Sequence, residues 1–373
     1  IQLLLIIRIT HSILSVEKMV SADLDKWPKV SLIMTARDEA QNIEATIGVR
    51  LKDTYPNIEF ILIDDRSTDG TSEIFDNVAS KDTRTKVVHV TELPEGWLGK
   101  INAMKEGLKI ATGEWLLFSD ADVHIQNGTI RKVIAYAEKN SLDHIAIIPE
   151  LRSTNFIIDI ISAVFVRLIC LIGRIWAVQN PKSSAAVGSG SFNLVRRKAL
   201  DITQGLEWLR LEPGDDVALG LMLKKSGAHQ AVINGNGYVR VSLYKSLGDL
   251  AKGFERTSFT TLANFSFLRI LIFSLVWFGL ELAPFLIVIP GINQEFLVIG
   301  LITITLSIIT SIAINHWLNR LILPALCWPI GMIFHIIFFI RASILTIKRK
   351  GIYWRGTFYP ISLLKQGRRY RFK

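Results

Sequence analysis

Cysteine is scarce in this chain of 373 residues. The only two, Cys170 and Cys327, each lie within an apolar stretch. They imply no disulfide framework, so the composition predicts a protein of a reducing compartment. A G-x-G-x-x-G turn is also missing after the first predicted strand, which argues against a dinucleotide-binding dehydrogenase.

Acidic residues are missing from the end of the chain. Residues 346–373 contain nine Lys and Arg and no Asp or Glu, and they hold nearly all of the net charge of +10. Because this basic segment follows apolar stretches, it indicates contact with a cytoplasmic membrane surface. We therefore expect no nucleic-acid partner.

Apolar residues are abundant: half of the chain is hydrophobic and the mean hydropathy is +0.34. Residues 267–289, 296–314 and 321–345 each have the length of a membrane span. Three full crossings would place the basic tail opposite a cytoplasmic domain, against the positive-inside rule. One of the three is therefore predicted not to cross fully, and the first and third, each with two prolines, are the candidates.

Two other apolar segments are harder to assign. Residues 1–7 are too short to span a bilayer, and they are either the end of an anchor or an interfacial piece. Residues 155–178 carry Arg167 and Arg174, seven apart, which weighs against a span. This segment is predicted to be an amphipathic helix on the membrane, with a buried domain helix as the alternative.

The first half of the chain predicts an α/β fold. Short apolar runs at 30–34, 59–63, 87–90 and 115–118 alternate with helical patterns, which indicates βαβ units and a mostly parallel sheet. In such sheets ligands bind at the carboxyl ends of the strands, near the switch in strand order. Polar clusters follow these runs, so we expect them to form one site.

The strand at 115–118 runs directly into Asp120 and Asp122. Residues two apart in extended chain point to the same side, so the two carboxylates are expected to converge. Such a pair favours Mg²⁺ or Mn²⁺, hard ions that also bridge phosphate oxygens. The alternative is that Asp120 caps a helix and Asp122 is solvated.

Two further stretches are candidates for the site. Residues 188–193, with the sequence G-S-G-S-F-N, suit a loop where backbone approaches a ligand, or else an ordinary turn. Residues 212–220 contain a Pro-Gly turn followed by Asp215 and Asp216 at a predicted helix start. Taken alone, these two carboxylates are caps that a helix N-terminus favours.

Five motifs occur in one order and together resemble the family 2 glycosyltransferases with a GT-A fold. They are T-A-R-D-E (35–39), D-D-R-S-T-D-G-T (64–71), G-K-I-N-A (99–103), D-A-D (120–122) and D-D-V-A-L (215–219). The resemblance covers residues 29–250, and the ordered set is far more specific than any single motif. Residues 94–100 and 353–359 are similar to membrane-bound enzymes that glycosylate lipids, notably the hopanoid-biosynthesis-associated and carotenoid-type branch.

The resemblance implies a role for each matching residue on the nucleotide side. Ala36, Arg37 and Glu39 would line the nucleobase and ribose pocket. Asp65 would contact the uracil or ribose, and Lys100 would meet the nucleotide near its diphosphate. The alternatives are that Asp65 caps the following helix and that Lys100 is a solvated helix-start lysine.

The resemblance also implies the metal ligands and the base. Asp120 would face the ribose and the metal, and Asp122 would ligate Mg²⁺ or Mn²⁺ in this DXD motif. Asp216, next to Asp215, would be the general base, with a helix cap as its alternative. The Q-x-x-R-W element of processive synthases is not found after this pair, although Q-G-R-R-Y at 366–370 has a similar spacing beyond the membrane segments.

The expected function is metal-dependent, inverting transfer of one hexose from a nucleotide-sugar, such as a UDP-sugar, to a hydroxyl of a membrane lipid. The alternatives are a polyprenyl-phosphate glycosyltransferase and a membrane scaffold with a degenerate transferase domain. The expected location is the prokaryotic inner membrane, multi-pass, with a cytoplasmic catalytic domain. The expected parts are an N-terminal segment (1–28), a GT-A domain (29–250), an interfacial connector (251–266), transmembrane helices (267–345) and a basic tail (346–373).

Overall fold

The structure is a computed structural model, and it describes residues 6, 7, 10, 11, 13, 23–152, 155–242, 244–289 and 294–370, without the side chains of residues 171 and 172. Most of the segment expected at residues 1–28 lies outside the described residues.

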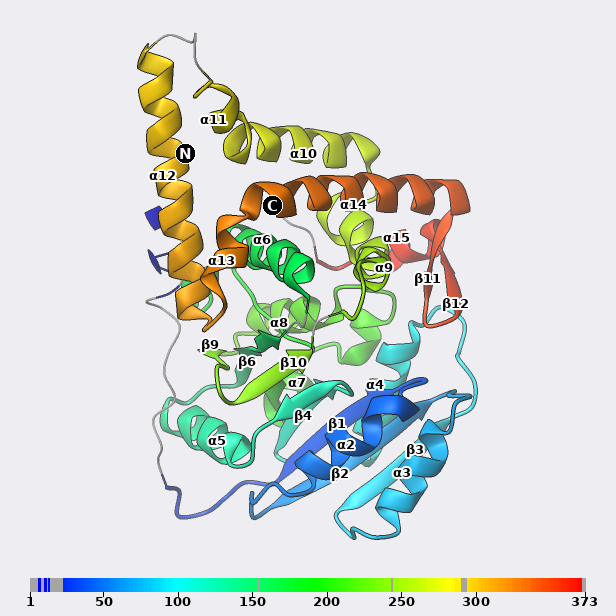
Figure 1. Cartoon of the computed structure of the whole chain (residues 1–373). Helices are drawn as coiled ribbons and strands as arrows, with labels where there is room; N and C mark the ends of the chain where they lie inside the picture. The colour runs from blue at the N-terminus through cyan, green and yellow to red at the C-terminus, as the bar shows by residue number, and fades with distance from the viewer. Residues whose placement is uncertain are drawn as a thin grey trace.

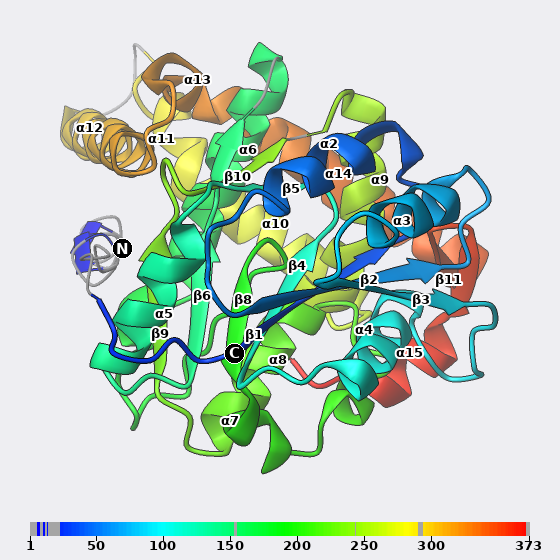
Figure 2. The same cartoon turned by 90° about the horizontal axis from the view of Figure 1, so that it is seen from below.

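A seven-stranded sheet forms the centre of the α/β domain, with the order β3-β2-β1-β4-β8-β6-β9 (Figures 1 and 2). All neighbouring strands are parallel except β8, which runs antiparallel to β4 and β6. The strands are β1 (Val30–Ala36), β2 (Ile58–Asp65), β3 (Thr85–Val90), β4 (Trp115–Asp120), β6 (His144–Ile148), β8 (Asn193–Arg196) and β9 (Gln230–Asn234). The four predicted strands and the mostly parallel sheet are confirmed.

Helices cover both faces of this sheet, as the nearly continuous apolar strands require. All eight residues of β2 are buried, so this strand needs cover on each side. One face packs against α2, α3 and α5, and the other against α4, α7 and α8. These helices are α2 (Ala40–Arg50), α3 (Thr71–Ala79), α4 (Gly99–Ile110), α5 (Thr129–Lys139), α7 (Arg197–Asp201) and α8 (Asp215–Lys225).

The strand order reverses between β1 and β4, because the chain builds β2 and β3 on one side of β1 and then returns to its other side. A smaller sheet of β5 (Val123–Ile125), β10 (Val239–Ser242) and β7 (Glu150–Arg152) lies next to the end of β4. The carboxyl ends of β1, β2 and β4 therefore share one edge at the switch point.

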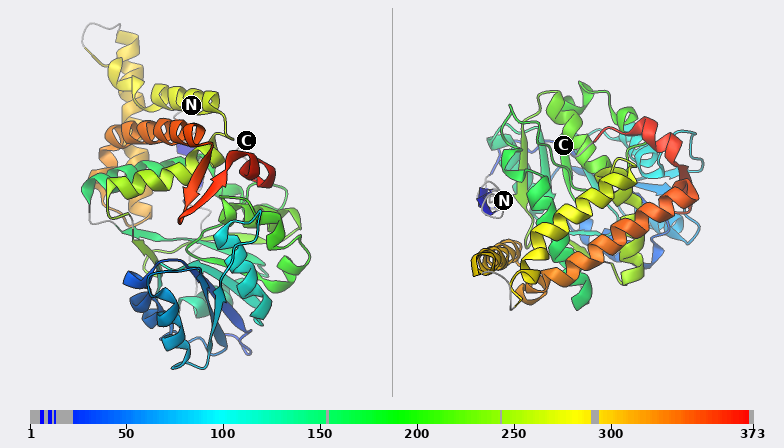
Figure 3. Two further views of the ribbon diagram at one scale, coloured as in Figure 1. Left: turned by 90° about the vertical axis from the view of Figure 1, so that its right-hand side faces the viewer. Right: turned by 90° about the horizontal axis from the view of Figure 1, so that it is seen from above.

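A layer of helices lies above this edge (Figures 1 and 3). It consists of α6 (Phe156–Ile172), α9 (Leu247–Thr257), the π-helical turn η3 (Ser258–Leu262), α10 (Phe267–Glu281), α11 (Ala283–Leu286), α12 (Gln294–Trp317), α13 (Ile322–Leu326) and α14 (Trp328–Arg349). Helix α14 packs across α6, α9 and α10. Seen from above, α12 is viewed nearly end-on while α10 and α14 are seen lengthwise (Figure 3).

Within the described residues, three helices are long and apolar enough to cross a membrane: Phe156–Ala177, Gln294–Trp317 and Trp328–Arg349. The first span predicted from the sequence, 267–289, is not one continuous helix. Helix α10 has 15 residues, about 22 Å at 1.5 Å per residue, and α11 follows it as a separate short helix. Helix α10 also meets the helical segment before it, Leu247–Leu262, at a bend of 100°.

Helix α6 corrects the prediction for residues 155–178. The helix ends at Ile172, and Arg174 has a left-handed φ of 48°, so Arg167 and Arg174 do not share a helical face. Arg167 is buried and pairs with Glu281 of α10 at 2.9 Å. The same guanidinium donates to the carbonyl of Ser307 at 2.9 Å and the hydroxyl of Ser311 at 2.8 Å on α12. The alternative of a buried domain helix therefore describes α6 better.

The basic tail folds back onto the α/β domain. After α14 the chain forms a hairpin of β11 (Gly351–Trp354) and β12 (Thr357–Pro360), then α15 (Ile361–Gly367). Buried side chains of this segment pack in the same core cluster as α4 and α8. The tail and the domain must lie on one side of any membrane, so an even number of crossings separates them.

Single-cysteine labelling tests this arrangement in intact membrane vesicles. With Cys170 and Cys327 replaced by Ser, we expect Ile202→Cys, exposed on the α/β domain, and Lys365→Cys, on α15, to react with an impermeant maleimide from the same side. Labelling from opposite sides would contradict the same-side arrangement.

Candidate active site

One large cleft, with a volume of about 1560 Å³, opens at the carboxyl ends of β1, β2 and β4. The structure brings every site residue predicted from the sequence to this cleft: Ala36, Arg37, Glu39, Asp65, Lys100, Asp120, Asp122, Asp215 and Asp216. They come from separate strand ends and helix starts because parallel strands end at a common edge. Their roles remain predictions.

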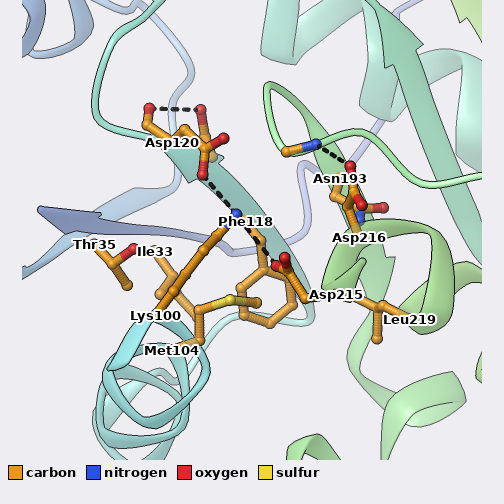
Figure 4. Close-up of a pocket in the computed structure, with 12 residues that line it drawn as sticks. Ile33, Thr35, Lys100, Met104, Phe118, Asp120, Asn193, Asp215, Asp216 and Leu219 are labelled. Atoms are coloured by element: carbon orange, nitrogen blue, oxygen red, sulfur yellow. Dashed lines mark hydrogen bonds and ion pairs between the residues drawn. The ribbon is translucent and has the colours of Figure 1, made fainter. Parts of the chain in front are cut away.

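Lys100 joins a carboxylate at the end of a strand to a carboxylate at the start of a helix (Figure 4). Its ammonium lies 2.8 Å from Asp120 at the end of β4 and 3.2 Å from Asp215 at the start of α8. Burial lowers the pKa of this lysine, but the charges of Asp120, Asp215 and Asp216 raise it by more, so it stays charged. The alternative of a solvated helix-start lysine is therefore wrong.

Asp216 lies on the first turn of α8 and faces the cleft. Its carboxylate accepts hydrogen bonds from the backbone N–H of Gly190 at 3.1 Å and of Val217 at 2.8 Å. Burial and then the charge of Asp215 raise the pKa of Asp216 to about 6, against the opposing effect of Lys100. A carboxylate tuned toward neutral pH is a better proton acceptor than an ordinary aspartate.

Asp122 lies in the turn between β4 and β5, where it is exposed to water in the cleft. Because a strand follows this turn, the alternative that Asp120 caps a helix is wrong. Nearby protein limits the solvation of Asp122, and this effect, then the charges of Asp120 and Glu39, raises its pKa. A concentration of negative charge that raises a carboxylate pKa in this way favours a bound cation.

The donor set fits a hard divalent ion that completes its coordination elsewhere. Within the described part of the chain, no group of three or more His, Cys, Asp or Glu is arranged around one point. Asp120 and Asp122 supply carboxylate oxygens, and Mg²⁺ is typically held by one or two carboxylates together with phosphates and water. The residues present therefore fit a cation that binds together with a phosphate-bearing ligand.

The ends of β1 and β2 form the side of the cleft that the sequence predicts to bind the nucleotide, called the nucleotide side below. Asp65 is buried and forms a bidentate pair with the neighbouring Arg66, at 2.8 and 3.1 Å. The N-cap of α3 is Gly70, which has no side chain for capping, so the proposed cap role of Asp65 is wrong. Arg37 and Glu39 lie on the loop after β1, which also lines the cleft.

Sequence reasoning did not identify Arg50, the last residue of α2. Its buried guanidinium donates to the carbonyls of Asp120 at 2.6 Å and Val123 at 3.0 Å, and to the hydroxyl of Ser119 at 3.0 Å. It thus fixes the backbone of the turn that carries Asp122. An arginine at the end of an ordinary helix gives no local signal of this long-range contact.

The hairpin after the apolar helices was also missed as part of the site. Arg355 donates to the carbonyl of Arg37 at 3.0 Å and forms an ion pair with Glu39. The backbone N–H of Gly99 donates to the hydroxyl of Tyr359 at 3.1 Å. The W-R-G-T segment seen in the sequence therefore reaches the nucleotide side of the cleft, about 320 residues after the loop it contacts.

The small-residue loop at 188–193 packs closely against the backbone of Asp120 and Asp216, while its approach to a ligand stays a prediction. The N–H of Asp120 donates to the carbonyl of Gly190 at 2.8 Å. A Cβ on Gly188 would lie 1.8 Å from the backbone oxygen of Asp216. The two glycines thus let this loop pass between the end of β4 and the start of α8.

Comparisons with known proteins agree with this architecture. Residues 31–202 match the family described as "Glycosyl transferase family 2". An uncharacterized glycosyltransferase of Haemophilus influenzae is 34% identical over 122 residues, which are 33% of this chain and 36% of that protein. A poly-beta-1,6-N-acetyl-D-glucosamine synthase of Staphylococcus epidermidis is 27% identical over 184 residues, or 49% and 43% of the two chains.

A solved structure has a similar fold over most of the chain. It is a mannosyltransferase from Pyrobaculum calidifontis in complex with GDP-Man and Mn²⁺, with a TM-score of 0.57 and 16% identity, covering 92% of this chain and 94% of that one. The fold is therefore GT-A. The match to family 2 glycosyltransferases covers residues 31–202, and the chain spans less than half the length of the curated relatives named here.

The replacement Gly188→Ala tests the close approach of residue 188 to the backbone of Asp216. The added Cβ must displace the backbone of Asp216, so we expect sugar transfer to fall about tenfold or more, as for about 1.4 kcal/mol of overpacking. The matched control is Gly48→Ala in α2, where no atom lies within 4 Å of the new Cβ. Wild-type transfer by Gly188→Ala would contradict this account.

Proposed function

We propose that the protein transfers a single sugar from a nucleotide-sugar, such as a UDP-sugar, to a hydroxyl group of a membrane lipid, with inversion and with Mg²⁺ or Mn²⁺. One observation carries the proposal: the cleft that holds the carboxylates extends between the apolar helices. The side chains that line its apolar end come from α6, α9 and α14: Phe165, Leu168, Ile169, Phe254 and Phe339.

The proposed chemistry follows from the charges at the sheet edge. The acceptor oxygen attacks the anomeric carbon, Asp216 takes the hydroxyl proton, and the bond from that carbon to the diphosphate breaks. A divalent cation held by Asp120 and Asp122 would offset the negative charge of the departing diphosphate. The domain family and the GDP-Man and Mn²⁺ of the similar mannosyltransferase structure support a nucleotide-sugar and a metal.

The helical layer would hold the mouth of the cleft against the bilayer. Exposed apolar side chains are numerous on α10, α12 and α14, for example Leu275, Ile302 and Ile337, each at least half exposed. Such a surface is favourable in contact with lipid tails and costly in water. We infer a membrane location, in a prokaryotic inner membrane, with the domain and the tail on the cytoplasmic side, where the basic residues favour them.

A second candidate is transfer to a polyprenyl phosphate. Lys245, Lys252 and Arg341 line the same cleft near its apolar end, where they would favour an anionic head group. A phosphate acceptor needs no general base, so the two candidates differ in their dependence on Asp216. The scaffold alternative is disfavoured, because all the expected carboxylates are present and face the cleft.

The first experiment is sugar transfer by the detergent-solubilised protein. We expect release of nucleoside diphosphate from one member of a panel of nucleotide-sugars, dependent on Mg²⁺ or Mn²⁺ and stimulated by total membrane lipid extract. Treatment with EDTA should abolish the release, and adding back the metal should restore it. If no nucleotide-sugar is consumed and no nucleotide binds, the scaffold reading gains support.

The replacement Asp216→Asn separates the two acceptor classes. If a hydroxyl is the acceptor, we expect transfer to fall at least about 100-fold, because general base catalysis typically contributes 10²–10⁴-fold. Nucleotide binding, measured by calorimetry, should stay within about threefold because the asparagine keeps the size of the side chain. Full transfer by Asp216→Asn would favour the phosphate acceptor.

The pH profile of the wild-type protein measures the same role independently. Asp216 must be ionised to accept a proton, so activity is lost as the pH falls through the raised pKa of about 6. We expect kcat/KM to fall about tenfold per pH unit below this point and to level off above it. An acid limb near pH 4 would contradict the assignment.

A further inference from the structure

Helix α2 buries an arginine on the face that packs against the sheet. The buried side chains of this helix recur at helical spacing: Ile43, Thr46, Ile47 and Arg50. The first three suit such a face, whereas Arg50 brings a permanent positive charge into it. A buried charge is costly unless its partners compensate it, so the contacts of Arg50 need an explanation beyond packing.

One nitrogen of Arg50 holds both ends of the turn between β4 and β5. Its Nη2 donates to the carbonyl of Asp120, the last residue of β4, at 2.6 Å and to the carbonyl of Val123, the first residue of β5, at 3.0 Å. The same nitrogen donates to the hydroxyl of Ser119 at 3.0 Å. The turn between the two carbonyls is only two residues long and includes Asp122, so this nitrogen restrains the segment that carries it.

The rest of the guanidinium faces the protein interior. Nη1 donates to the sulfur of Met34 in β1 at 2.7 Å, and Nε has no hydrogen-bond partner among the described residues. Arg50 is 3% exposed, and it is not among the residues that line the cleft. It therefore acts on the site through the turn and through its charge, without touching a ligand.

The charge of Arg50 and the restraint on the turn have opposite effects on a metal. Burial lowers the pKa of Arg50 to about 10, and the charges of Asp122 and then Asp120 oppose this effect, so the group stays charged at neutral pH. A positive charge beneath these carboxylates would weaken the binding of a cation. A restrained turn would strengthen it, because carboxylates that are already in place lose less freedom on binding.

We propose that Arg50 is the positioning residue of the metal site, and that it holds the β4–β5 turn so that Asp120 and Asp122 are placed for a divalent cation before any ligand binds. The proposal rests on the proposed function, which assigns a cation to these carboxylates, and adds the residue that prepares them. Arg50 and Asp120 lie 70 residues apart in the chain. Outer contacts of this kind orient metal ligands, and their loss typically weakens metal binding about 10- to 100-fold.

Mn²⁺ binding by the detergent-solubilised protein tests the proposal without sugar transfer. Electron paramagnetic resonance of free Mn²⁺ gives the dissociation constant, with and without UDP or GDP. We expect Arg50→Met to raise this constant about tenfold, and Arg50→Lys, whose side chain keeps the charge but is one bond shorter, about threefold. If Arg50 acted through its charge alone, Arg50→Met would bind Mn²⁺ more tightly and Arg50→Lys would equal the wild type.

Arg84 supplies the matched control at the same end of α2. It donates to the carbonyl of Leu51, the residue after Arg50, at 2.7 Å and pairs with Asp82 at 2.7 Å, and it lies outside the cleft lining. Arg84→Met should lower the thermal stability without changing Mn²⁺ binding. If Arg50 had only a structural role, its variants would behave in the same way.

The metal dependence of transfer separates positioning from loss of structure. Both Arg50 variants should need more Mn²⁺ for half-maximal transfer, in the same proportion as for binding, and should approach the wild-type kcat at saturating Mn²⁺. A loss of kcat that excess Mn²⁺ does not restore would indicate a structural role and overturn the proposal.

The binding outcomes distinguish this proposal from the proposed function. Weaker Mn²⁺ binding in both Arg50 variants supports it, whether or not a lipid acceptor is found. If the wild-type protein binds Mn²⁺ and the variants bind it equally well or more tightly, this proposal alone is overturned. If the wild-type protein binds no Mn²⁺, with or without a nucleotide, the metal in the proposed function is overturned with it. Should Arg50→Met fail to fold, the result for Arg50→Lys decides.

Discussion

The site depends on the way one partly buried ammonium holds together a carboxylate of β4 and a carboxylate of α8. Lys100 pairs with Asp120 and Asp215, which lie 95 residues apart in the chain, and its charge also acts on Asp216. Without Lys100, the carboxylates of Asp120 and Asp215 would repel each other strongly in a site that is partly removed from water. Lys100 therefore makes it possible for β4 and α8 to meet at one cleft.

The positive charge of Lys100 does not balance the negative charge of the carboxylates in this site. Arg50 contributes a second positive charge beneath the β4–β5 turn, but it donates to carbonyls and to the Ser119 hydroxyl, and Asp122 still has a raised pKa. A nucleotide diphosphate would bring more negative charge to the same place. Asp120 and Asp122 would hold a divalent cation, which would supply positive charge to offset both the carboxylates and the diphosphate. The charge distribution of the protein alone thus favours a metal with the substrate.

The catalytic half of the molecule could be predicted because its signals are local. The polar clusters after β1, β2 and β4 directly follow their own strands, as Asp120 follows β4, and the parallel sheet brings these strand ends to one edge. Arg50 and Arg355 could not be placed in the site in this way. Each reaches the site through a contact with a distant part of the chain, although the segment 353–359 stands out in the sequence by its resemblance.

The apolar helices contain contacts and orientations that a hydropathy pattern does not predict. A hydropathy window counts Arg167 as a cost and cannot see that Glu281 and two serines of other helices compensate it. Breaking such a buried pair typically costs about 3–5 kcal/mol, so it restrains α6, α10 and α12 against one another. The hydropathy window also does not predict how a helix is oriented. Helix α14 has the length of a span, yet it lies across the other helices beneath α10 (Figure 1).

The returning tail links these two halves. Because its hairpin contacts Arg37 and Glu39 and its end is bound by Glu212, the segment after α14 must lie on the same side of a membrane as the α/β domain for the cleft to be complete. The same contacts therefore complete the cleft and require the tail to lie on the same side of a membrane as the α/β domain. The cleft changes from carboxylates at the sheet edge to apolar side chains at α6, α9 and α14. An acceptor with a polar head and an apolar tail, as proposed, would match that change along its length.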